Sequence, residues 1–255
     1  MNVTNGTNVS SAAVTNTSGT LNNDATMNIT TLTNSGTLQG NGTYNITQSF
    51  TNTGTFTYGT STVNFDGTIA QSVPALTYYN LTLSGSGTMS LSGSTIALGT
   101  VTLSAGTFDV TSSNYALSVG GNWTNNGGTF SPEGGTVTFS GTASQAINGT
   151  AASQTFNSVI VNLTSGLTLS CGGSTTTLNV GGSFTETTGN FTAPATMSVT
   201  GTITLTAGTF TGGTNLSAGG NWTNNGATFT ANSGTVTFNG TTQAIGGSAP
   251  TTFGY

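Results

Sequence analysis

Short segments in which apolar and polar residues alternate recur along the whole chain, and they restrict its fold more than any other feature. Typical examples read VNF, LTL, VTL, LSV, VTF, LNV and ITL. Successive segments lie 16 to 22 residues apart, with a mean near 19. This period is too long for a hairpin repeat and is typical of one β-helix coil, in which two or three short strands wind around an axis. The segments fall near Ile29, Ile46, Val63, Leu81, Val101, Leu117, Val137, Val159, Leu178, Val199, Leu216 and Val236.

The alternation predicts which side chains enter the core. Successive side chains of a strand point to opposite faces, so the apolar residues point inward and the intervening Thr, Ser and Asn face water. We expect Thr82, Thr102, Thr138 and Thr237 to face outward. The residues expected inside are Leu81, Leu83, Val101, Leu103, Val137, Phe139, Val236 and Phe238.

The sequence also contains longer repeats, which include the short segments. The segment from Gly120 to Ile147 reads GGNWTNNGGTFSPEGGTVTFSGTASQAI, and the segment from Gly219 to Ile245 reads GGNWTNNGATFTANSGTVTFNGTTQAI. A weaker copy covers residues 50–75, and a fragment, GGSFTETTGNF, begins at Gly181. Asn-Gly and Gly-Gly pairs between the strands tolerate the positive φ of tight corners. We therefore predict an all-β fold: one continuous parallel β-solenoid over residues 1–255, with about 19 residues per coil and no significant α-helix.

Two other interpretations stay open. The abundance of Asn, Thr, Ser and Gly is also typical of low-complexity segments that aggregate or remain disordered. An antiparallel sandwich or a propeller has strands every 8–12 residues, which half of the period observed here imitates.

The charge composition excludes several classes of partner. The chain has no Lys, Arg or His and only five acidic residues, so 2% of its residues are charged, against about 25% in an ordinary domain. Without cations it cannot neutralise phosphates, so we expect no nucleic-acid partner and no docking on anionic lipid. No apolar run is long enough to span a membrane, so we expect no membrane insertion. No signal peptide is visible, and we expect the chain to be a segment of a longer repeat protein.

The residue inventory also argues against catalysis, cofactors and metals. A Ser–His–Asp or Cys–His arrangement needs His, and zinc sites need His or Cys clusters, whereas Cys171 is the only cysteine. Asp24, Asp66 and Asp109 are 42 and 43 residues apart, so they could stack along one edge and act on polysaccharide or bind calcium. We favour solvated turn residues instead. We predict no enzymatic activity, and neither catalytic, cofactor-binding nor metal-binding residues.

Two further surface roles compete with plain packing. Trp123 and Trp222 occupy equivalent repeat positions and could stack on sugars, but core or corner packing is the simpler explanation. Pairs of the form Thr-x-Thr are typical of ice-binding solenoids, yet they recur in only some coils, so β-propensity explains them. The pairs are Thr100/Thr102, Thr136/Thr138, Thr202/Thr204 and Thr235/Thr237.

The repeat unit resembles the strand repeats of large bacterial surface proteins. The unit GGNWTNNG-TF…TVTFNGT-QAI is similar in style to repeats of the haemagglutinin-like and autotransporter adhesins, most clearly from Phe50 onward. The resemblance implies a right-handed parallel β-helix and a cell-surface location, and it carries no catalytic motif. The chain contains neither the family's N-terminal secretion domain nor its C-terminal translocator barrel.

Two functions therefore compete. The first is an extracellular structural protein, a fibre or surface-filament component whose partners are copies of itself or further repeats of the same chain, joined end to end. The second is an adhesive stalk module that binds cell-surface glycans or neighbouring cells. A polysaccharide-acting β-helix enzyme is a distant third. For the first function we expect the last coil, residues 238–255, to be covered by the first coil, residues 3–21, of another copy or by more of the same chain.

Overall fold

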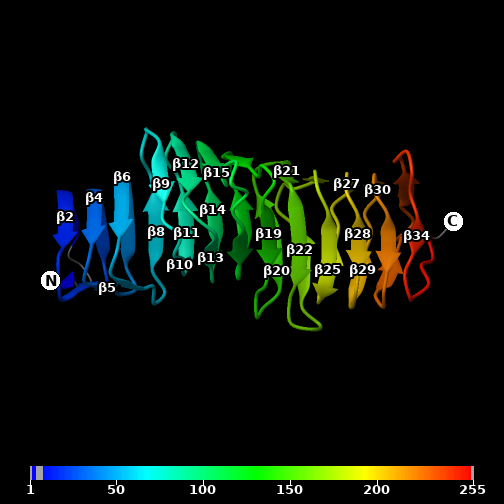
Figure 1. Ribbon diagram of the computed structural model, residues 1–255, viewed down its shortest axis with the longest axis horizontal. Coiled ribbons are helices and arrows are strands. Elements are labelled where there is room, and N and C mark those ends of the chain that lie inside the picture. Colours follow the sequence, from blue (N-terminus) through cyan, green and yellow to red (C-terminus); the bar gives the residue numbers. More distant parts are fainter. Residues whose placement is uncertain (1, 4–7, 254–255) are drawn as a thin grey trace.

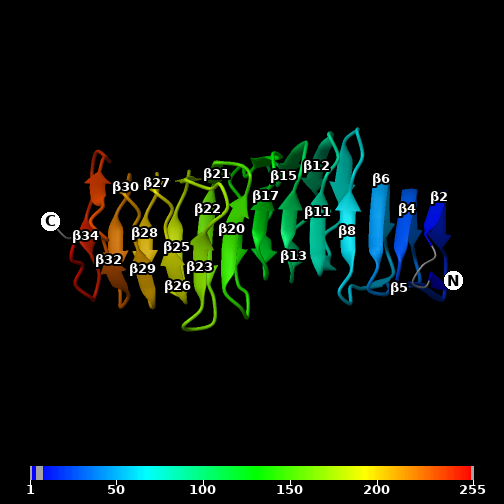
Figure 2. The ribbon, with the colours of Figure 1, turned by 180° about the vertical axis from the view of Figure 1, so that it is seen from behind.

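The computed structural model describes residues 2–3 and 8–253, so residues 4–7 and 254–255 of the two coils predicted to meet end to end lie outside the described residues. The described residues form strands, turns and bends, without a helix and thus without one that could span a membrane. All the strand pairs are parallel, and about 13 turns stack into a rod that the chain follows from end to end (Figures 1 and 2). The predicted all-β solenoid is confirmed.

One sheet of 12 strands runs along the whole rod and forms its first side. It contains, in spatial order, β2 (Val9–Asn16), β4 (Thr26–Asn34), β6 (Thr43–Asn52), β8 (Thr62–Phe65), β11 (Asn80–Leu83), β14 (Val101–Leu103), β17 (Trp123–Asn125), β20 (Gln145–Gly149), β23 (Thr168–Cys171), β26 (Asn190–Thr192), β29 (Thr209–Thr211) and β32 (Thr228–Thr230).

The second side consists of two shorter sheets, one after the other. The first has four strands, β9 (Gln71–Val73), β12 (Thr88–Leu91), β15 (Thr107–Asp109) and β18 (Thr129–Ser131). The second has five strands, β21 (Ser153–Phe156), β24 (Thr177–Val180), β27 (Thr196–Val199), β30 (Asn215–Ala218) and β33 (Thr235–Phe238).

The third side is also divided into two sheets. The N-terminal one has four strands, β1 (Asn2–Val3), β3 (Thr20–Asn23), β5 (Thr37–Gln39) and β7 (Thr55–Thr57). The other has nine strands, β10 (Thr77–Tyr78), β13 (Thr95–Ala97), β16 (Leu117–Val119), β19 (Thr136–Phe139), β22 (Ser158–Asn162), β25 (Phe184–Thr188), β28 (Ile203–Leu205), β31 (Trp222–Asn224) and β34 (Ile245–Gly246).

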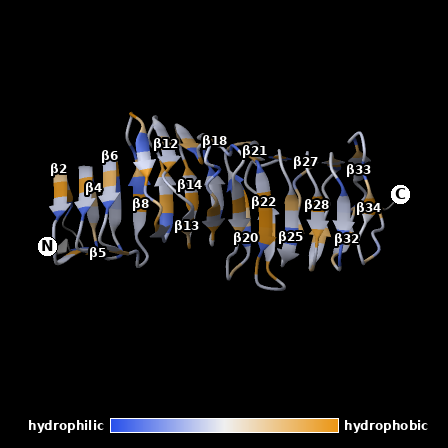
Figure 3. Ribbon diagram, in the orientation of Figure 1, coloured by the Kyte–Doolittle hydropathy of each residue, from blue (hydrophilic) through white to orange (hydrophobic). Residues whose placement is uncertain are grey.

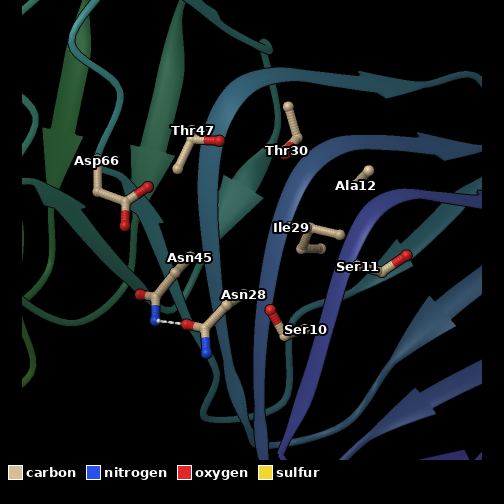
Figure 4. Close-up of a pocket in the computed structure, with 9 residues that line it drawn as sticks. All are labelled: Ser10, Ser11, Ala12, Asn28, Ile29, Thr30, Asn45, Thr47 and Asp66. Atoms are coloured by element: carbon tan, nitrogen blue, oxygen red, sulfur yellow. Dashed lines mark hydrogen bonds between the residues drawn. The ribbon is translucent and has the colours of Figure 1, made fainter.

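The N-terminal coils differ from the rest. Strands β2, β4 and β6 have 8, 9 and 10 residues and bend around a corner of the rod, so each covers two sides (Figure 4). The ladder between β4 and β6 shifts register between Ile29 and Thr31, which is the irregularity a strand needs in order to bend. From β8 onward each coil has three short strands.

The coil length varies more than the sequence period suggests. Asn45 bonds to Asn28 on the neighbouring coil, 17 residues away, whereas Thr124 bonds to Asn148, 24 residues away. The assumption of one coil per period is therefore wrong in places. Val101 lies in β14 and pairs with Trp123, whereas Leu117, the next segment in the period, lies in β16 on another side. A second such step separates Val159 in β22 from Leu178 in β24.

The core is one continuous apolar column, as the alternation predicts. Strands carry alternating apolar and polar residues along the whole rod (Figure 3). Six of the eight residues expected inside are at most 2% exposed, while Thr82, Thr102 and Thr138 are half-buried. Val236 and Phe238 are only half-buried, although they are less exposed than Thr235 and Thr237 beside them. The predicted register is correct for these two, but no strand in the described residues covers β33 on its far edge.

Candidate functional surface

The carboxylates do not gather into a site. Asp24 follows β3, Asp66 follows β8 and Asp109 lies in β15, which places them at three different sheets. The three Asp residues therefore do not stack along one edge, because the strands that precede or carry them occupy different positions within their coils. Asp24 accepts hydrogen bonds from the Asn22 side chain at 2.6 Å and the Asn41 amide at 3.0 Å, and both hold its pKa below the usual value. No group of three His, Cys, Asp or Glu residues that could hold a metal occurs among the residues described.

Asp66 borders a surface concavity where β2, β4 and β6 bend. The concavity has a volume of about 400 Å³ and extends from Asp66 at one edge to Ser11 at the other, across the hydrogen-bonded pair Asn28 and Asn45 (Figure 4). One carboxylate oxygen of Asp66, Oδ1, is buried without a hydrogen-bond partner in the described structure, and burial raises the pKa of the group.

Glu186 is an acid inside the core. It lies in β25 with its side chain facing inward, between Val161 and Leu205 of the neighbouring coils. The residue is fully buried, and neither carboxylate oxygen has a hydrogen-bond partner in the described structure. Burial raises the pKa of Glu186 to about 8, so the carboxyl is predominantly protonated at pH 7.

Repeat comparison shows what Glu186 replaces. The fragment Phe184-Thr185-Glu186 corresponds to Trp-Thr-Asn in the two long copies, where Asn125 and Asn224 are buried. Asn224 accepts the amide N–H groups of Gly226 and Ala227 at 3.1 and 3.0 Å and donates to the Pro250 carbonyl at 3.0 Å. A carboxylate cannot donate in this way. Sequence reasoning missed Glu186, although the fragment that begins at Gly181 signals the exchange.

Trp123 and Trp222 pack in the core, so the packing interpretation is correct and the sugar-stacking one is wrong. Both are fully buried, and each contacts the edge or face of neighbouring aromatic rings. Trp123 donates its indole N–H to Gln154 at 3.3 Å, and Trp222 donates to Thr251 at 3.1 Å. Neither ring is available to stack on a sugar.

The four Thr-x-Thr pairs are spread over three sheets. Thr100/Thr102 lies at the 12-stranded sheet, Thr136/Thr138 and Thr202/Thr204 lie at the nine-stranded sheet, and Thr235/Thr237 lies in the five-stranded sheet. They do not form one flat array. Cys171 is free and half-buried, and burial raises its pKa to about 12, so its thiol is not activated.

The structure also shows a glutamine side chain that hydrogen-bonds to the backbone at three corners of the rod, which sequence reasoning missed. The side chains of Gln71, Gln145 and Gln243 each turn back to accept the amide N–H of Gly67, Gly141 and Gly240, at 2.8, 3.0 and 2.8 Å. Each also donates to a carbonyl of the preceding coil, that of Ile46, Val119 and Ala218. The Gln near the end of each repeat copy, three or four residues after the Gly of Gly-Thr, is the signal that could have revealed it.

Comparisons with family models, curated proteins and solved structures give no match.

Proposed function

We propose that this chain is an extracellular structural protein, a β-solenoid component of a fibre or surface filament. Its partners are copies of itself or further repeats of the same chain, joined end to end so that the sheets continue across the junction. The resemblance of its repeats to those of bacterial surface proteins supports the location, and the lack of Lys, Arg and His excludes ion pairs with anionic partners.

The observation that best supports the proposal is that one edge of β33 is not covered by another strand within the described residues. Val137 and Phe139 of β19 are at most 2% exposed, because β22 pairs with β19 and covers them. Their repeat counterparts Val236 and Phe238 are half-buried, and within the described residues β33 pairs only with β30. An edge with unpaired backbone groups and half-exposed apolar side chains is a template for a further strand. Natural sheets protect such edges with charges or Pro, and β33 has neither.

Electron microscopy of negatively stained protein tests this. We expect the chain to form rods much longer than one copy, and we expect Val236→Lys to shorten them, because the cation would lie where the next coil packs. Thr138→Lys is the matched control, since it adds the same charge on the outside of an interior strand. A wild-type chain that stays monomeric at high concentration, or rods that Val236→Lys leaves unchanged, would contradict the proposal.

An adhesive module is the second candidate, and one observation favours it. Ile96 and Leu98 are each 43% exposed, two residues apart on the outside of the rod, where most outward strand positions carry Thr, Ser or Asn. They line a surface concavity together with Tyr79. Such a patch is a reason to look for a ligand.

A further inference from the structure

The repeat builds a small surface recess three times. In each copy a strand that ends in Phe is followed by a polar residue, Gly and Thr, and this tripeptide lines a concavity. The tripeptides are Asp66-Gly67-Thr68 after β8, Ser140-Gly141-Thr142 after β19 and Asn239-Gly240-Thr241 after β33. The three volumes are about 330, 310 and 360 Å³. Similar volumes at equivalent residues show that the recess belongs to the repeat.

The glycine in each tripeptide is required by a close backbone approach. A Cβ atom at Gly67, Gly141 or Gly240 would collide with a carbonyl oxygen of the preceding coil, that of Thr47, Gly120 and Gly219 respectively. The corner glutamine described above holds the N–H of the same glycine. The recess is therefore rigid before any ligand arrives, which lowers the entropic cost of binding.

The three recesses do not share one side of the rod. Strands β8, β19 and β33 belong to the 12-, nine- and five-stranded sheets. A flat partner could not contact all three at once. The arrangement suits separate small ligands around the rod.

The recess after β19 differs from the other two in its walls. Ile96 and Leu98 are exposed there, and the half-buried Tyr79 lies against Gly99, where a Cβ would come within 3.2 Å of its ring. Hydroxyl groups complete the lining: Ser140 is hydrogen-bonded to Ser118 at 2.9 Å, and Thr142 is exposed. The recess after β33 has Ser198 and Thr200 in place of Ile96 and Leu98.

The chemistry of this lining selects a class of ligand. The chain has no cation, so phosphate, sulfate and carboxylate groups find no ionic partner. An aromatic and aliphatic wall beside neutral hydroxyl groups matches a molecule that has a C–H face and a rim of hydroxyls, which describes a sugar ring. A volume of about 310 Å³ is at the lower limit of small-molecule pockets, so the ligand is one or two rings.

We propose that the recess after β19 binds a neutral saccharide of one or two rings. Tyr79, Ile96 and Leu98 contact the C–H face of the ring. The hydroxyls of Ser140 and Thr142 bond to its hydroxyl groups. The recess after β33 is the polar form of the same site and binds more weakly. This proposal does not depend on fibre formation.

The test is saturation-transfer NMR and calorimetry on the whole chain with cellobiose, lactose and N,N′-diacetylchitobiose. We expect saturable binding of at least one of them. The double variant Ile96→Ser, Leu98→Thr gives this recess the wall of the one after β33, and we expect it to weaken binding at least tenfold. Both residues are exposed, so the fold should tolerate the change, and the melting temperature checks this.

The reciprocal variant tests the same idea by gain of function. Ser198→Ile with Thr200→Leu should create a second site and raise the stoichiometry. Absence of saturable binding to all three sugars would overturn the proposal. Binding that the first double variant leaves unchanged would also overturn it, because the ligand would then lie elsewhere. Fibre length is measured separately, so either result is independent of the assembly proposal.

Discussion

The repeat copy at 120–147 and the copy at 219–245 make the same local contacts on different sides of the rod. Trp123 lies 4.8 Å from Phe130, and Trp222 lies 4.8 Å from Phe229. Each Trp pairs with the Ile that ends its own copy. Yet Trp123 belongs to the 12-stranded sheet and Trp222 to the nine-stranded sheet.

The difference teaches what the repeat encodes. Its residues specify how one strand packs on the next coil, because those contacts recur. They do not specify a side of the rod, because the two copies lie on different sides and coil length varies along the rod. A surface feature that the repeat carries is therefore displayed in several directions, as the three recesses are.

The copies also differ in what covers them. Phe156 packs against Trp123, Phe130 and Phe139, and Phe253 packs in the same way on the second copy. Beyond that, β22 covers the first copy, whereas the described residues hold no equivalent strand for the second. Matched substitutions in the two copies should measure the effect of this cover.

The largest expected difference is at the Phe that ends the strand. Phe139→Ala removes a fully buried ring and should lower the free energy of unfolding by about 3–5 kcal/mol. Phe238→Ala removes a half-buried ring and should cost about 1–2 kcal/mol. Urea denaturation monitored by circular dichroism measures both. The comparison is made under conditions where the chain is monomeric, because the fibre proposal requires that Phe238 be covered at every junction. Equal losses would mean that Phe238 is covered in solution.

The next effect concerns the fragment in which Glu186 replaces the repeat Asn. The folded pKa of about 8 lies above the ordinary value of 4.5, so between these values the folded chain binds more protons than the unfolded chain. Stability should therefore fall as the pH rises through this window, by at most about 1.4 kcal/mol per pH unit, and level off above it.

Glu186→Gln removes this titration and should flatten the pH dependence of unfolding while stabilising the fold at pH 8. Glu133→Gln is the control, because Glu133 is exposed. Urea midpoints from pH 4 to pH 9 give the measurement. If the free energy of unfolding of Glu186→Gln still falls with pH, another group causes the pH dependence.

A smaller effect is expected at the corner glutamines. Gln145→Ala leaves the Gly141 amide without its partner in a buried corner and removes one of the two hydrogen bonds to the Val119 carbonyl, which should cost about 1–3 kcal/mol. Gln243→Ala should cost less, because Gln243 is half-buried and water can replace it. Hydrogen exchange at the Gly141 and Gly240 amides should accelerate in the respective variants. Unchanged exchange would show that the glutamine does not hold the turn.

The smallest effect is at the outward threonines. Thr138→Ala and Thr237→Ala should each change the free energy of unfolding by no more than about 0.5 kcal/mol, since both face water. The same denaturation experiment checks this. A large loss at Thr237 alone would point to a contact with another copy at that edge.

The sequence by itself determined the class of fold and the register of its strands. Leu81, Val101 and Val137 point inward as the alternation predicts, because parity within a strand is a local property that the pleat enforces. Core or corner packing was also the favoured interpretation for the two Trp residues at equivalent repeat positions, and both are buried. The sequence also excluded sites that need His or a cation, since composition alone decides that.

Only the tertiary structure decided which side of the rod each segment occupies. Segments such as Val101-Thr102-Leu103 and Leu117-Ser118-Val119 have the same alternation, but the first lies in the 12-stranded sheet and the second in the nine-stranded sheet. The choice depends on the length of each turn and on which earlier strand is free to pair, and both are set by the coil below. For that reason the separation of Asp24, Asp66 and Asp109, the burial of Glu186 and the three recesses could not be derived from sequence spacing alone.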